Sequence, residues 1–523
     1  KAKLMYLDND LPVVWQSAFG VPNAQQTDIF AMSERVSSET FDSATLLAIE
    51  PEQRADWLES RMAACMSQEL GLSEKEFDPA QALSRYGVDS LLAVEMAHRI
   101  ESGFEVTIDS VSLLEGASLR SLVAQIIEQL SNEDQVVGAQ LARLEEDRIE
   151  YPLSHGQRAM WFLHEFSPDN LAYNLGLASR IDEELDVVAL QKAFQTLVDR
   201  HPSLRTNYRS VDGEPVQRVH KNKRLFFLHE DASDWSDADI RFRLNRSVMK
   251  PFDLKKGPVF RVSVLTKSEK CHYMLMSVHH IAVDMWSLVV MIDELKLLYP
   301  AMRTSTSIEL PEIPYRYTDF VNWQNSVLMG ERGGELRAYW KNALSECQAV
   351  LELPTDYPRP PVQGYAGATV SMKIPLEDSL RVNEFAKAQD VTPFVLLLAV
   401  FQVLLHRYTG QEDILVGSPV AGRSRYGLEG IVGYFVDPVV LRAKFDEDRS
   451  FNDFIKLCKS DVLGALSHQD YPMANLVEQI QPTRDTSRSP LFQAMFVLQK
   501  AYQKKDEDLT GFVLGETGGE ISL

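Results

Sequence analysis

Cysteine is scarce in this chain of 523 residues. Its four cysteines, Cys65, Cys271, Cys347 and Cys458, are scattered and form no Cys-x-x-Cys pair. A disulfide framework or a structural zinc site needs closely spaced or paired cysteines, so the sequence predicts neither, and we expect no metal site. This cysteine usage is typical of a reducing compartment, and we expect the protein in the cytoplasm.

Long apolar runs are also missing. The most apolar run, residues 391–405, contains Thr392, Pro393 and Gln402. A transmembrane helix needs about 20 predominantly apolar residues, so this shorter run predicts a buried helix of a folded domain. Residues 1–8 lack the long apolar stretch of a signal peptide. We therefore expect no membrane partner.

The chain has fewer basic than acidic residues. The chain has 53 Lys and Arg against 75 Asp and Glu, which gives a formal net charge of -22 and a pI near 5.0. Nucleic acids and anionic membranes attract basic surfaces, so this balance argues against both as partners. Basic surfaces on other proteins remain compatible with it.

Internal repeats and low-complexity tracts are absent, and the chain is too long for one core. Residues 1–50 are expected to be the tail of an upstream domain and a linker. A small all-α bundle is predicted over residues 51–131, and the charged residues 132–150 are predicted to be a second linker. Residues 151–523 alternate helical patterns, for example over residues 187–199, with β-like runs, which predicts a large α/β region.

Two adjacent histidines end an apolar strand in residues 273–287. His279 and His280 close the strand, and a helix is predicted to begin about four residues later. Unperturbed His changes charge near neutral pH, so a His at a strand end is a candidate proton acceptor. Adjacent strand residues point to opposite faces, so only one of the two can face a cleft. A hydrogen-bonded core histidine is the competing interpretation.

A serine stands at the start of a predicted helix near residue 90. Leu92, Met96 and Ile100 recur at helical spacing and leave Ser90 exposed at the N-terminus, beside Asp89. Both Ser and Asp are common helix N-caps, so a simple cap is one interpretation. Helices predicted over residues 53–70 and 119–130 would complete a bundle.

This bundle, with its Asp89-Ser90-Leu91 motif, resembles an acyl carrier protein of the polyketide type. The resemblance implies that Ser90 carries a covalent 4'-phosphopantetheine arm, attached by a phosphopantetheinyl transferase. Peptidyl carriers more often have a Gly-Gly pair before the serine, whereas this chain has Val88 and Asp89. The departure favours a polyketide acyl chain as the cargo, and upstream polyketide synthase domains as partners.

The large region resembles the condensation domains of nonribosomal peptide synthetases. Seven segments occur in the family's order: 153–161, 200–206, 279–284, 317–323, 432–436, 468–472 and 484–491. The resemblance implies an α/β domain of two chloramphenicol-acetyltransferase-like lobes that form a V, with the first lobe ending near residue 325. A central tunnel at the histidines would admit carrier arms from opposite sides. The chain stops at Leu523, before such a domain is expected to finish, so its last strand and helix are expected to be missing.

Departures from the family's motifs bear on the subtype. Heterocyclisation relatives have aspartate where this chain has His279 and His280, which argues against ring formation. Epimerisation relatives usually have Ser-Trp where this chain has Trp286-Ser287. Met285 replaces the usual glycine and Asp437 replaces the usual asparagine. Both changes bear on which acceptor is used.

Roles follow from the resemblance. The predicted catalytic set is His280, His279 and Asp284, with His280 as the base that takes the proton of an attacking amine. Asp284 is expected to be architectural, paired with Arg423, and Trp286 and Ser287 are expected to cap and pack the following helix. For two further arginines, Arg158 and Arg205, a fold-supporting role and substrate contact are both open.

Three functional hypotheses follow. The first is amide formation between an acyl chain on Ser90 and an aminoacyl thioester on a downstream peptidyl carrier. The second keeps the enzyme but uses a diffusible alcohol or amine, which gives an ester or releases the chain. The third is a catalytically silent domain that serves as a docking or gatekeeping scaffold. Intact His280 and Asp284 favour an enzyme over the scaffold.

Overall fold

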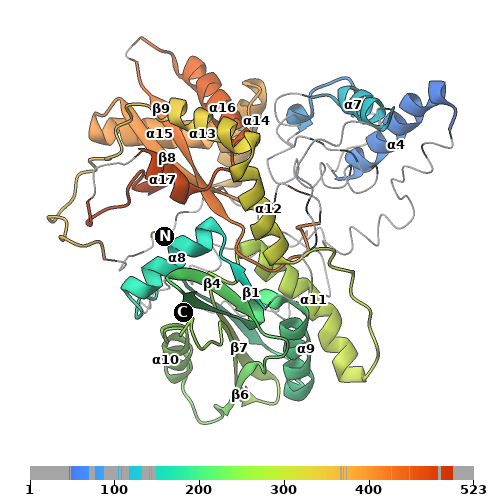
Figure 1. Cartoon of the computed structure of the whole chain (residues 1–523), viewed down its shortest axis with the longest axis vertical. Coiled ribbons are helices and arrows are strands. Elements are labelled where there is room, and N and C mark those ends of the chain that lie inside the picture. Colours follow the sequence, from blue (N-terminus) through green and yellow to red (C-terminus); the bar gives the residue numbers. More distant parts are fainter. Residues whose placement is uncertain are drawn as a thin grey trace.

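The computed structural model describes four main stretches of the chain and a few isolated residues. These are residues 49–69, 77–86, 117–131 and 149–498, with gaps at 365–367, 369, 371, 373, 424, 426, 447 and 481–484, together with residues 46, 100, 104, 106, 108, 141 and 143. Figure 1 shows a helical body beside two larger lobes, with helix α12 lying between the lobes. The sequence predicts this combination of an all-α part and an α/β part, and the structure confirms it.

The helical body contains η1 (Pro51–Gln53), α4 (Arg54–Glu69), η2 (Leu83–Tyr86) and α7 (Leu119–Ser131). Its core is apolar and includes Leu58 and Met62 of α4 and Leu122 and Ile126 of α7. The helices predicted over residues 53–70 and 119–130 are therefore confirmed, because their apolar residues recur at the spacing that buries one helix face. Ser90 and its motif lie outside the described residues.

The first lobe contains two sheets and four long helices. Its elements are β1 (Glu150–Pro152), α8 (His155–Phe166), β2 (Asn174–Ile181), α9 (Val187–Arg200), η3 (Pro202–Arg205), β3 (Thr206–Val211), β4 (Glu214–Val219), β5 (Phe226–Asp231), α10 (Asp237–Val248), β6 (Phe260–Ser268), β7 (Cys271–His279) and α11 (Met285–Thr304). The strand orders are β1-β4-β3 and β2-β7-β6-β5. Strand β7 is central in the larger sheet, paired antiparallel with both β2 and β6.

The second lobe begins with α12, where the buried apolar residues change from one core to the other. Its elements are α12 (Tyr317–Met329), α13 (Glu331–Ala343), α14 (Leu376–Ala388), α15 (Pro393–Thr409), β8 (Asp413–Val420), β9 (Asp437–Lys444), α16 (Phe451–Ser467), α17 (Met473–Ile480) and β10 (Ala494–Met495). Its sheet has the order β10-β8-β9. Leu463 and Leu466 of α16 also pack against the core of the helical body.

Helix α15 is the helix that the apolar run of residues 391–405 predicts, and it is buried on part of its surface only. Leu398, Ala399 and Leu405 are buried, but Val400 and Tyr408 are 48% and 65% exposed. α15 packs against α14, α16 and β8 and still leaves part of its surface exposed, and composition alone does not reveal which residues lie there.

The segment between β8 and β9 connects the two lobes. It leaves the second lobe after Val420 and returns at Asp437, and on the way Val432 enters the core of the first lobe. Tyr434 packs against both cores. Residues far apart in the sequence are therefore brought to one place at the lobe junction.

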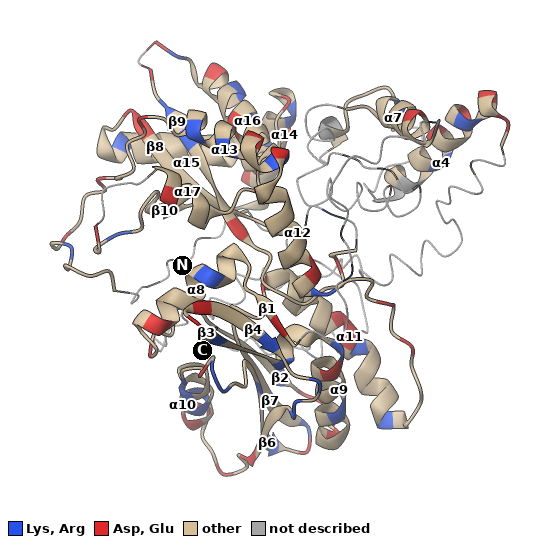
Figure 2. Ribbon diagram, viewed as in Figure 1, with Lys and Arg blue, Asp and Glu red and all other residues tan. Residues whose placement is uncertain are grey.

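Acidic and basic residues are interspersed over the helices of both lobes (Figure 2). Within the described ranges, no single helix is long and apolar enough to cross a bilayer. Helices α14 and α15 pass that test as a pair by length and composition only, and the chain bends by 101° between them.

Candidate active site

The end of β7 places the two histidines. The backbone N–H of His279 donates to the Val259 carbonyl at 2.9 Å, and that of His280 donates to the Tyr173 carbonyl at 2.9 Å. The chain then turns, and α11 begins at Met285. Both histidines are thus fixed by backbone hydrogen bonds to the segments on either side of β7.

The tautomer of His280 follows from its hydrogen bond. Its Nδ1 lies 2.8 Å from the Val283 carbonyl oxygen, which can only accept, so Nδ1 carries the proton. Burial lowers the pKa of His280, although the Val283 carbonyl and nearby Asp284 oppose this. The ring is therefore neutral at neutral pH, and Nε2 has a lone pair that can accept a proton.

His279 has a different environment. Its side chain is 3% exposed, and its Nδ1 accepts the N–H of Ile281 at 3.1 Å. The rings of His164, Tyr173 and Phe252 surround it. Burial, with His164 and His280 nearby, lowers the pKa of His279 to about 3. This imidazole stays neutral inside the first lobe.

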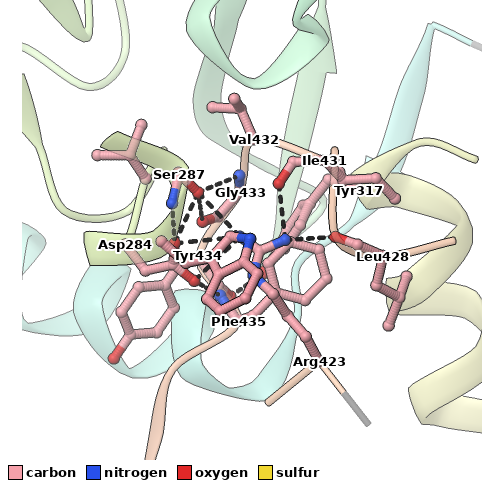
Figure 3. A network of polar contacts seen from close by, with 12 residues as sticks. Asp284, Ser287, Tyr317, Arg423, Leu428, Ile431, Val432, Gly433, Tyr434 and Phe435 are labelled. Atoms are coloured by element: carbon pink, nitrogen blue, oxygen red, sulfur yellow. Dashed lines mark hydrogen bonds and ion pairs between the residues drawn. The ribbon is translucent and has the colours of Figure 1, made fainter. Parts of the chain in front are cut away.

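An ion pair between Asp284 and Arg423 joins the lobes (Figure 3). Asp284 stands just before α11, and Arg423 belongs to the segment between β8 and β9. Arg423 Nη2 lies 3.1 Å from Asp284 Oδ1, and each residue is 2% exposed. The second carboxylate oxygen, Oδ2, accepts the N–H of Phe435 at 3.1 Å. The structure thus contains the pair that the sequence predicts, while the architectural role of Asp284 stays a prediction.

The guanidinium of Arg423 is enclosed by its own segment. Nη1 donates to the carbonyls of Leu428 and Ile431 at 2.5 and 2.7 Å, and the Phe435 ring centre lies 3.9 Å from the guanidinium carbon. Burial lowers the pKa of Arg423, but arginine is not deprotonated in proteins, so the group stays charged. Residues 428–435 are therefore wrapped around a buried cation.

The helix cap differs from the one predicted. Asp284, not Trp286 or Ser287, caps α11, because its extended backbone lets Oδ1 accept the Ser287 N–H at 2.8 Å. Ser287 Oγ instead donates to Asp284 and accepts the N–H of Gly433 at 3.0 Å. Trp286 Nε1 donates to the Glu429 carbonyl at 2.9 Å. Both residues therefore support the connection between the lobes.

The two departures from the family's motifs lie near this network. Met285 is the first residue of α11 and is partly exposed. Asp437 is the first residue of β9, and its carboxylate accepts the N–H of Met473 at the start of α17 at 2.8 Å. Burial raises the pKa of Asp437 to about 7.

Three residues outside the predicted set belong to the site. Tyr434 lies edge-on to His280, with ring centres 5.2 Å apart at 90°. The Tyr317 hydroxyl donates to the Tyr434 carbonyl at 2.6 Å, and Gly156 faces the Tyr434 ring. All three stand in segments that the sequence singled out, but no sequence pattern indicates that Tyr317 and Gly156 both contact Tyr434. Of the two further arginines, Arg158 lies 3.6 Å from Glu214 and Arg205 donates to the His220 carbonyl.

Comparison with known proteins decides the family. A family model described as "Condensation domain" matches residues 147–520, and one described as "Phosphopantetheine attachment site" matches residues 60–126. The chain belongs to the condensation-domain family. It also contains a phosphopantetheine attachment domain that spans Ser90, whose hydroxyl is the group expected to bear covalent 4'-phosphopantetheine. The described residues contain no cluster of three or more His, Cys, Asp or Glu that could hold a metal ion.

Nonribosomal peptide synthetases are among the relatives of this condensation-domain chain. A linear gramicidin synthase of Brevibacillus parabrevis is 35% identical over 417 residues, which cover 79% of this chain and 5% of that protein. The chain thus spans a small part of the curated relatives it matches. A four-domain nonribosomal peptide synthetase bound to AMP and glycine aligns with a TM-score of 0.61 and 25% identity, covering 69% of this chain and 27% of that one. The teicoplanin X-domain, solved in complex with OxyB, aligns with a TM-score of 0.62 and 26% identity, covering 68% and 78%.

Breaking the buried ion pair tests its architectural role. Asp284→Ala should lower the free energy of unfolding by about 3–5 kcal/mol, because it leaves a buried guanidinium without its countercharge. Asp186→Ala is the matched control, since Asp186 caps α9 from an exposed position and should cost only about 1 kcal/mol. The measurement is urea unfolding of both variants, and equal losses would contradict the role.

The raised pKa of Asp437 predicts a pH dependence of stability. Its folded pKa of about 7 lies above the ordinary value of 3.8, so the folded chain keeps a proton that the unfolded chain releases. The stabilising contribution is full below pH 3.8 and is lost as the pH rises through about 7. Asp437→Asn should therefore flatten this part of the stability profile and raise the melting temperature at pH 8 by a few degrees. An unchanged profile between pH 5 and 8 would show that Asp437 does not titrate there.

Proposed function

We propose that this chain carries an acyl group on the arm attached to Ser90 and condenses it with an amine to form an amide. The proposal rests on the protonation and hydrogen bonding of the His280 ring. Its ring is neutral, Nδ1–H is held by Val283, and Nε2 has no hydrogen-bond partner among the described residues. A positioned base of this kind is what aminolysis of a thioester needs. The similarity to linear gramicidin synthases supports the same reaction class.

Ser90, His280 and His279 have different roles in the proposed reaction. When attached to Ser90, phosphopantetheine supplies a thiol that holds the acyl group as a thioester. His280 Nε2 accepts a proton from the attacking amine as the nitrogen–carbon bond forms. His280 would then give this proton to the departing thiolate as the carbon–sulfur bond breaks, which returns its ring to the neutral form. His279 is assigned a structural role, because its ring is buried on the other side of the strand end.

The donor and the partners are proposed more specifically. Val88 and Asp89 before Ser90 favour a polyketide acyl chain, supplied by upstream polyketide synthase domains. The acceptor is proposed to be an aminoacyl thioester on a downstream peptidyl carrier that enters the tunnel from the opposite side. A phosphopantetheinyl transferase would load Ser90, and the few scattered cysteines support a location in the cytoplasm.

Two other functions remain in competition. Met285 in place of the family's glycine keeps open a diffusible alcohol or amine as acceptor, which would give an ester or release the chain. The scaffold function is supported by the similarity to the X-domain that was solved bound to OxyB. Since Nε2 of His280 has no hydrogen-bond partner in the part of the chain that the structure describes, the site favours the enzyme over the scaffold.

Reconstitution tests the proposed function. The protein is treated with a phosphopantetheinyl transferase and an acyl coenzyme A, and intact-protein mass spectrometry should show one acylated arm that is absent in Ser90→Ala. An amine acceptor, first as an aminoacyl thioester on a carrier and then as a free amine, should then yield the amide. His280→Ala should slow this step by roughly 10²- to 10⁴-fold, which is typical when acid–base assistance is lost.

His229→Ala is the matched control, because His229 is an exposed histidine of the same lobe. It should turn over like wild type. Product from an alcohol but not from an amine would favour the ester function. A loaded wild-type protein that gives no product with any acceptor would favour the scaffold.

A further inference from the structure

Tyr434 is the aromatic residue in contact with the proposed base. Its ring meets the His280 ring at 5.2 Å and 90°, which is an edge-to-face arrangement. The hydrogen bond from Nδ1 to Val283 fixes one edge of the imidazole, but a ring held at one edge can still tilt about that contact. A second contact on the ring removes this freedom.

The backbone on both sides of Tyr434 is held by the buried network. Gly433 N–H donates to Ser287 Oγ at 3.0 Å, and Phe435 N–H donates to Asp284 Oδ2 at 3.1 Å. The Tyr434 carbonyl accepts the Tyr317 hydroxyl at 2.6 Å. Three consecutive residues are therefore fixed, so the Tyr434 ring can move only by rotating about its own side-chain bonds.

Gly156 of α8 limits that rotation. A methyl group added at Gly156 would lie 2.7 Å from Cε1 and 3.3 Å from Cδ1 of the Tyr434 ring. Carbon atoms do not approach to 2.7 Å, so the ring would have to turn, and because its backbone is held it would turn away from its present position on His280. The glycine thus leaves the space that the Tyr434 ring occupies.

We propose that Tyr434 is a positioning residue that holds the His280 ring in its reactive orientation, with Gly156 providing the space for it. The buried network of Asp284, Ser287 and Arg423 then acts on the base through Tyr434. The inference rests on the proposed function, because it concerns the orientation of the same base. The Tyr434 hydroxyl makes no hydrogen bond within the described residues. The aromatic ring of Tyr434, not its hydroxyl, therefore positions His280.

Substitutions at Tyr434 separate the ring from the hydroxyl. Tyr434→Phe should keep kcat/KM within about twofold of wild type, whereas Tyr434→Ala should lower it by about 10- to 10²-fold, as small misplacements of catalytic groups do. Tyr434→Ala also admits water beside His280, so the pKa of His280 should rise toward its ordinary value. The other titratable groups near the imidazole, His279 and Asp284, are unchanged in both variants. NMR titration of histidine-labelled protein measures that pKa without turnover.

Gly156→Ala provides an independent test. It should lower kcat/KM by about tenfold, and it should add little to Tyr434→Ala in the double variant, because the ring it displaces is gone. Gly334→Ala is the matched control, since Gly334 lies in α13 with nothing within 4 Å of an added methyl group.

The outcomes separate the two proposals. A Tyr434→Ala protein that keeps both the activity and the His280 pKa of wild type would overturn the positioning role. Fully additive effects of Gly156→Ala and Tyr434→Ala would also overturn it. Inactive wild-type protein would overturn the proposed function alone, because the pKa of His280 reports on Tyr434 without any turnover. If Tyr434→Ala does not fold, Gly156→Ala judged against Gly334→Ala decides the question.

Discussion

The ion pair between Asp284 and Arg423 is the interaction on which the rest of the site depends. Moving two charges from water into the protein costs several kcal/mol per ion. The attraction between the charges offsets this cost only when their other hydrogen-bonding atoms also have partners. Here the carboxylate accepts bonds from Ser287 and Phe435 as well as from the guanidinium. The guanidinium itself donates to the Leu428 and Ile431 carbonyls, and only its buried Nε lacks a partner among the described residues. The pair is therefore stable only when the segment between β8 and β9 adopts this one conformation.

The ion pair affects the proposed base, His280, through the backbone of residues 433–435. Asp284 lies four residues after His280 in the sequence but does not hydrogen-bond to its ring; the imidazole is held by Val283 and contacted by Tyr434. Asp284 of the first lobe thus fixes the segment between β8 and β9 of the second lobe. That segment places the Tyr434 ring against His280 of the first lobe. The two lobes of the condensation domain share one site for this reason. Separating them would remove the contact on the base as well as the ion pair.

Sequence patterns predict the parts of this protein that depend on local spacing. A helix is predicted over residues 187–199 and α9 is found at Val187–Arg200, because its apolar residues recur with helical period. The apolar run before His279 and His280 predicts the strand that ends there. The pairing of Asp284 with Arg423 is predicted from the family resemblance. The sequence assigns the cap of α11 to Trp286 and Ser287 instead of Asp284, because Ser and Asp are both favoured caps and only the backbone angles decide between them. The tautomer of His280, the contact of Tyr434 with Gly156 and the raised pKa of Asp437 arise from tertiary packing, which no periodicity in the sequence records.

Amide hydrogen exchange of residues 428–436 reports directly on whether the buried pair holds this segment, because the N–H groups of Gly433 and Phe435 are bonded to Ser287 and Asp284. The comparison is between wild type, Asp284→Ala and the exposed-cap variant Asp186→Ala, with β6 and β7 as internal references. We predict that residues 428–436 of Asp284→Ala lose more protection than β6 and β7, beyond the general loss that follows from its lower free energy of unfolding, whereas Asp186→Ala shows no such excess. If residues 428–436 of Asp284→Ala lost no more protection than the strands, the prediction would be contradicted, because the loop would then be held by something other than the buried pair.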